Sequence, residues 1–110
     1  MSVEEKNKID IITTNKEGIL VLTISDHLEW GSDNEHLVIL QEKINSYLHF
    51  IESGQIAESY PDVVGEKIMI QIVFKYQPNK IAEEFLAIIK SFINEKSYAF
   101  NFYKLESNWN

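Results

Sequence analysis

Six side chains that can bind a metal ion or move a proton lie between residues 26 and 36: Asp26, His27, Glu29, Asp33, Glu35 and His36. Carboxylates and imidazoles together can bind a first-row metal ion. Asp26 next to His27 could also form a general base with the carboxylate that orients it. A metal-binding protein or a metal-dependent hydrolase is therefore one hypothesis. Its ligands would be Asp26, His27, Glu29 and His36.

These acids also fit an ordinary solvent-exposed helix start. The motifs that would define metal or nucleophile chemistry are absent. The sequence contains no H-x-x-x-H, H-E-x-x-H or EF-hand pattern. No G-x-S-x-G or S-x-x-K motif surrounds Ser25 or Ser32. The positive end of a helix dipole favours Asp33 and Glu35 at a helix start without any metal. We predict no catalytic residue and no cofactor.

The negative charge is concentrated in one part of the chain. Residues 25–62 contain eight acidic residues and one lysine, a balance of −7 that equals the net charge of the whole protein. Such a segment repels phosphate backbones, and the chain contains no arginine, so we expect no nucleic-acid partner. A basic protein partner suits this charge. Acidity that serves only solubility is the alternative.

The leading hypothesis is a non-enzymatic protein-interaction module that uses this acidic surface. Neutralisation of a basic partner is one version of it. Trp30 could be an exposed anchor for the partner, or it could pack between helix and sheet. The predicted contact residues are Asp26, His27, Glu29, Trp30, Asp33, Glu58, Tyr60 and Asp62.

Hydrophobic periodicity predicts six regular elements. We expect strands at residues 8–14, 19–25, 66–76 and 98–105, with a turn at 15–18 between the first two. Ser32 and Glu35 fit a capping box, which predicts a helix from there to Gly54. Its apolar stripe would be Leu37, Leu40, Ile44, Tyr47, Leu48 and Ile51. A second helix should start at Asn79, with the stripe Ala82, Phe85, Leu86, Ile89, Phe92 and Ile93.

The element order is β-β-α-(β)-β-α-β, in which the bracketed strand is a short candidate at residues 55–60. This order predicts an α/β (α+β) two-layer sandwich, with a mixed sheet of about four strands and two helices on one face. Residues 1–110 would form one domain, frayed at 1–7 and 107–110. The open sheet face could support a homodimer. It would carry Thr14, Val21, Thr23, Met69, Gln71, Val73, Asn101 and Tyr103 in some combination.

Two stretches carry a family resemblance: IDIITTNKEGILVLTISDHLEW and EHLVILQEKINSYLHFIESGQIAESYP. Together they are similar to a family of small bacterial α/β domains of unknown function, and the similarity extends from about Ile9 to about Leu105. The resemblance implies a stand-alone bacterial, cytoplasmic domain and supplies no catalytic residues. The absence of cysteine suits a reducing cytoplasm. No run of apolar residues is long enough to span a membrane.

Overall fold

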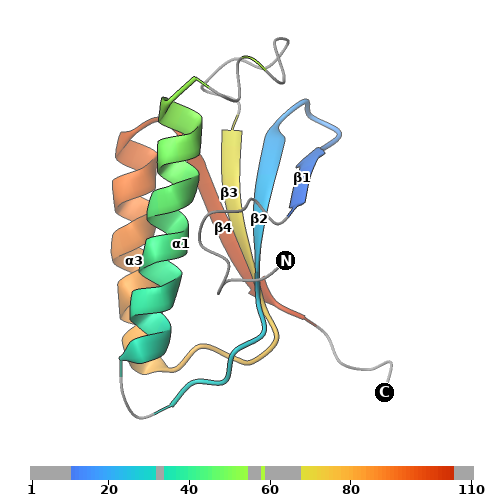
Figure 1. The fold of residues 1–110 in the computed structure, drawn as a ribbon. Coiled ribbons are helices and arrows are strands. Elements are labelled where there is room, and N and C mark those ends of the chain that lie inside the picture. Colours follow the sequence, from blue (N-terminus) through green and yellow to red (C-terminus); the bar gives the residue numbers. More distant parts are fainter. Residues whose placement is uncertain (1–10, 32–33, 55–57, 59–67, 106–110) are drawn as a thin grey trace.

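Four strands and two helices form the described part of the chain (Figure 1). The computed structural model describes residues 11–31, 34–54, 58 and 68–105. The elements are β1 (Ile11–Thr14), β2 (Leu20–Asp26), α1 (Glu35–Glu52), β3 (Ile68–Phe74), α3 (Lys80–Glu95) and β4 (Ala99–Lys104). The expected frayed ends and the candidate strand at 55–60 lie outside the described residues, apart from Glu58.

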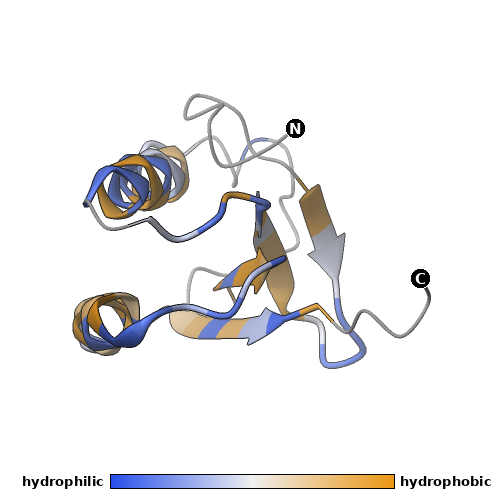
Figure 2. Ribbon diagram, turned by 90° about the horizontal axis from the view of Figure 1, so that it is seen from below, coloured by the Kyte–Doolittle hydropathy of each residue, from blue (hydrophilic) through white to orange (hydrophobic). Residues whose placement is uncertain are grey.

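The strands lie in the sheet in the order in which they occur along the chain. β1 pairs antiparallel with β2, and β2–β3 and β3–β4 pair in parallel. Figures 1 and 2 show both helices against the same face of the sheet. The predicted two-layer α/β sandwich with a four-stranded mixed sheet is confirmed.

The β1–β2 hairpin is fixed by the turn residues between its strands. The Asn15 side-chain oxygen accepts hydrogen bonds from the backbone N–H groups of Glu17 and Ile19, at 2.9 and 3.0 Å. Gly18 adopts a φ of +81°, which a residue without a Cβ reaches at little cost. The predicted turn at 15–18 is confirmed.

The core lies between the sheet and the helices. Alternate residues of β3 point into it, and Ile68, Ile70, Ile72 and Phe74 are buried while the residues between them are half-buried. Tyr47 of α1 is fully buried, and its hydroxyl donates to the backbone oxygen of Thr23 at 2.8 Å. This hydrogen bond ties α1 to the middle of β2.

The two helices begin in different ways. The Asn79 side chain accepts a 2.8 Å hydrogen bond from the backbone N–H of Ala82, so the predicted cap of α3 is confirmed. The predicted capping box of α1 is wrong. Glu35 is the first helical residue and not the third, and the N-cap Asn34 makes no side-chain cap bond. The start of α1 is held by a tertiary contact of His36 that is described below.

The open face of the sheet is partly polar. Asn101 donates to Gln71 at 3.2 Å, and Gln71 donates to Thr23 at 3.4 Å, which makes a row of side-chain hydrogen bonds across three strands. Thr14 was predicted on this face. It pairs with Leu20 and therefore shares the helix-covered side, because directly paired residues point to the same face. Self-association through the open face stays a prediction.

The packing of α3 makes a first prediction about stability. Leu86 is fully buried, whereas Ile88 on the same helix is 69% exposed. We expect Leu86→Ala to lower the free energy of unfolding by about 3 kcal/mol, because it leaves a cavity in the core. Ile88→Ala is the matched control and should change that free energy by less than about 0.5 kcal/mol. Urea denaturation followed by circular dichroism measures both, and similar losses in the two variants would contradict the packing.

Candidate functional site

A buried acid–histidine pair joins the end of β2 to the start of α1. Asp26 is the last residue of β2, and its side chain points to the helix-covered face with Leu22 and Ile24. His36 is the second residue of α1. Its Nε2 lies 2.6 and 2.8 Å from the two Asp26 carboxylate oxygens. The two side chains are 0% (Asp26) and 5% (His36) exposed, so the interaction is shielded from water.

Trp30 covers this pair. Its indole stacks on the His36 ring with centroids 3.6 Å apart and an interplanar angle of 21°. Its Nε1–H donates to the backbone oxygen of Tyr76 at 3.3 Å, and its ring is tilted against Phe74 at 5.8 Å. Trp30 therefore packs between the helix and the sheet, which is one of the two roles predicted for it. We call these three residues the Asp26–Trp30–His36 cluster.

The cluster also shapes the loop that follows β2. One Asp26 carboxylate oxygen accepts a 3.1 Å hydrogen bond from the backbone N–H of Leu28. Burial raises the pKa of Asp26 above its ordinary value of 3.8, and this effect outweighs the hydrogen bond with His36, which lowers the pKa. The cluster therefore favours a carboxyl group that retains its proton to a higher pH than a solvated aspartate does.

An imidazole oriented by a carboxylate is the arrangement of a general base. In this cluster Nε2 faces the carboxylate, which leaves Nδ1 as the second ring nitrogen. Nδ1 is buried and has no hydrogen-bond partner among the described residues. The Trp30 ring lies against the imidazole. The geometry therefore fits an interior polar contact that positions the loop and the helix, and not a base that meets a substrate.

The structure separates the other residues that the sequence singled out. His27, Glu29 and Glu58 are exposed, whereas Asp26 lies inside the protein. Asp33, Tyr60 and Asp62 lie outside the described residues, as does Ser32. Within the described ranges, no three histidine, aspartate or glutamate side chains are grouped so that they could hold a metal ion. The metal-site hypothesis stays a prediction.

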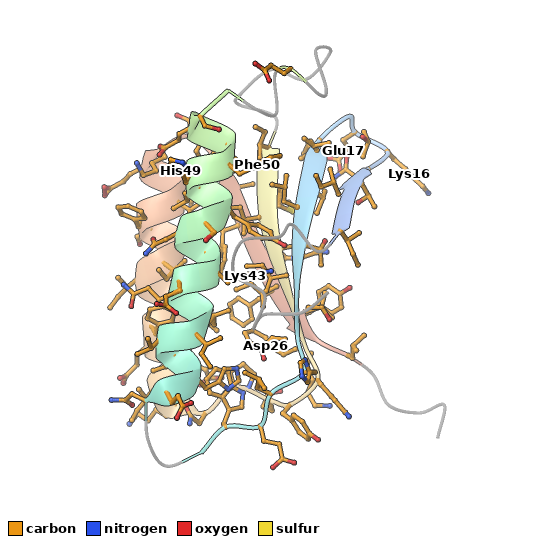
Figure 3. All side chains as sticks on the ribbon, viewed as in Figure 1. Lys16, Glu17, Asp26, Lys43, His49 and Phe50 are labelled. Atoms are coloured by element: carbon orange, nitrogen blue, oxygen red, sulfur yellow. The ribbon has the colours of Figure 1, made fainter. Side chains whose placement is uncertain are left out.

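Lys43 is a buried residue that the sequence analysis missed. It is 0% exposed, and its Nζ lies 5.6 Å from the centre of the Tyr47 ring. Figure 3 shows it on the side of α1 that faces the sheet. A signal was available, because Lys43 follows Leu40 by three residues and precedes Tyr47 by four, which places it on the buried stripe. Because lysine is usually exposed, the residue type did not indicate a buried position.

The burial of Lys43 changes the charge that α1 presents to solvent. Lys43 is the only lysine in residues 25–62. Glu35, Glu42 and Glu52 of α1 are all exposed. Glu35 and Glu42 are seven residues apart and therefore lie on one side of the helix. The outer side of α1 carries acidic groups while the lysine of the segment is inside.

The chain matches a family described as a family of unknown function (DUF6572) over residues 1–106, and it belongs to that family. Neither the curated proteins nor the solved structures contain a match. No helix in the described part of the chain has the length and apolar character needed to cross a membrane. The bacterial origin and the cytoplasmic location expected from the sequence stay predictions.

The buried pair makes a prediction about stability. We expect His36→Leu to lower the free energy of unfolding by about 3 kcal/mol, because it leaves the Asp26 carboxyl group buried without its partner. The double variant Asp26→Leu/His36→Leu should lose less free energy of unfolding than His36→Leu, since two apolar side chains leave no buried polar group unpaired. Urea denaturation of the two variants and the wild type gives the comparison. A double variant less stable than His36→Leu would count against the pair.

The raised pKa of Asp26 also predicts how stability depends on pH. A group whose pKa is raised by folding contributes most stability below its unfolded pKa and loses this contribution as the pH rises through the folded value. The stability of the wild type minus that of Asp26→Asn should therefore decrease as the pH rises above about 4, since the variant lacks the titrating group. Denaturant unfolding at a series of pH values measures this difference. If the stability difference between wild type and variant increases with pH, folding lowers the pKa of Asp26 and the prediction is wrong.

Proposed function

We propose that this protein is a non-enzymatic protein-interaction module that binds a basic protein partner through an acidic surface. The observation that carries the proposal is the complete burial of Lys43. Because the one lysine of residues 25–62 lies in the core, the exposed side of α1 is more acidic than the composition of the helix indicates.

The surface charges support a partner of opposite sign. Glu35, Glu42 and Glu52 are exposed along α1, and Glu29 is exposed in the loop before it. Glu52 is paired with Lys96 of its own chain at 3.1 Å. The acids that face the partner are Glu29, Glu35 and Glu42. Complementary charge speeds association and selects among partners more than it adds affinity. Neutralisation of a basic partner is one form that such binding would take.

The interior cluster supports the non-enzymatic part of the proposal. The His36 imidazole is the histidine that a carboxylate orients, and it is buried against Trp30. We therefore assign no catalytic residue. The Asp26–Trp30–His36 cluster instead fixes the loop and the first turn of α1, so that the exposed acids are held on a rigid element.

A charge-neutralising variant tests this function. Tagged wild-type protein expressed in its source cells should co-purify a basic protein in near-stoichiometric amount. Glu35→Gln/Glu42→Gln should reduce that yield at least tenfold, because it removes two charges from the contact surface. Glu17→Gln/Glu83→Gln removes two exposed charges elsewhere and is the matched control, which should retain the partner. Quantitative mass spectrometry measures the yields. Equal recovery by all three proteins, or recovery of no partner, would overturn the proposal.

A further inference from the structure

The outer side of the helical layer exposes large apolar side chains. Val38 of α1 is 52% exposed, and Ile81, Ile88 and Phe92 of α3 are 58%, 69% and 47% exposed. Single exposed apolar residues are ordinary, whereas a contiguous apolar patch marks a contact surface. Phe92 was predicted on the buried stripe of α3. The apolar sector of this helix is wider than the part that the sheet and α1 cover.

An ion pair shows how these residues are arranged. Lys96, just after α3, places its Nζ 3.1 Å from Glu52 of α1 and 5.2 Å from the centre of the Phe92 ring. The flank of α3 that carries Phe92 therefore faces the flank of α1 that carries Glu52. Val38 precedes Glu52 by about four helical turns and lies on the same flank.

The two helices also start at the same end of the layer. Figure 1 shows α1 and α3 side by side and running in the same direction, as two consecutive β-α-β units require. Val38 is in the first turn of α1, and Ile81 is in the first turn of α3. The four exposed apolar residues therefore lie on the outer side of two parallel neighbouring helices. We call Val38, Ile81, Ile88 and Phe92 the helix seam.

Acidic side chains border the seam on both sides, and all four are exposed. On each helix they lie three, four or seven residues from a seam residue, which places them next to it on the helix surface. They are Glu35 and Glu42 on α1, and Glu84 and Glu95 on α3. Of the lysines on or next to α3, Lys96 is paired with Glu52. The seam is an apolar strip between two acidic rows.

We propose that the helix seam receives a cationic amphipathic helix of the partner protein, an inference that rests on the function proposed above and names the partner's chemistry. The apolar side of such a helix would cover the seam, and lysine or arginine side chains on its flanks would meet the acidic rows. A second copy of this chain fits less well. Each copy has a net charge of −7 and would place acids against acids.

The spacing of the seam suits a helical ligand. Ile81, Ile88 and Phe92 are separated by seven and four residues, which corresponds to about 10 and 6 Å along α3. A helix that lies along the seam presents its own apolar residues at the same intervals. The acidic rows then select cationic helices from among the many amphipathic helices of a cell.

The test uses the full chain and a synthetic leucine–lysine peptide of about 16 residues, the length of α3, whose leucines lie on one helical face. A peptide with the same composition but no apolar face is the probe control. Fluorescence anisotropy should show that the amphipathic peptide binds at least tenfold more tightly than its control. Ile81→Ser/Ile88→Ser should weaken that binding at least tenfold. Ile11→Ser/Tyr103→Ser removes two exposed apolar side chains from the sheet side and should leave it unchanged.

The remaining outcomes separate the two proposals. If Glu35→Gln/Glu42→Gln weakens peptide binding and Ile81→Ser/Ile88→Ser does not, the seam proposal is overturned and the acidic surface stands. If neither pair of substitutions affects binding, or if the amphipathic peptide does not bind, both proposals lose their support. Light scattering of the wild type and of Ile81→Ser/Ile88→Ser tests whether a second copy of the chain occupies the seam. A dimer that Ile81→Ser/Ile88→Ser converts to a monomer would identify a second copy as the occupant and overturn the proposal.

Discussion

The buried contact between Asp26 and His36 is the interaction on which the arrangement of the helical layer depends. It joins the last residue of β2 to the second residue of α1, at 2.6 Å and out of contact with water. Because N-cap Asn34 makes no side-chain cap bond, this contact and the stacked Trp30 determine where the helix starts. The rotation of α1 about its axis follows, and with it the placement of Lys43 inside and the glutamates outside.

The two sides of the sheet are stabilised by different forces. The covered side is mostly aliphatic and aromatic, and the hydrophobic effect stabilises it in proportion to the area removed from water. The open side has the side-chain hydrogen bonds of Thr23, Gln71 and Asn101, which connect β2, β3 and β4. The helical layer has apolar side chains on two sides, because one side packs on the sheet and the other carries the helix seam toward solvent.

Periodicity predicted the elements and the fold because strands and helices place side chains at fixed intervals. It did not predict that His36 and Lys43 are buried, since a polar residue enters a core only when a tertiary contact compensates for the lost water. The sequence singled out Asp26, His36 and Trp30 but could not show which of them meet, because the loop geometry decides this. It placed Phe92 on the buried stripe of α3, and this prediction is wrong, because the neighbouring elements do not extend far enough to cover that side of the helix.

The strand order has a consequence for how the chain can fold. Each strand pairs with its neighbour in the sequence, so no strand has to be inserted between two that have already paired. The β1–β2 hairpin closes through a short turn, whereas each parallel pairing has to wait for a helical crossover to close a longer loop. The sheet can therefore grow from either edge by successive addition. The β2–α1–β3 unit forms the largest internal step, and the contact between Asp26 and His36 closes the loop between its first two elements.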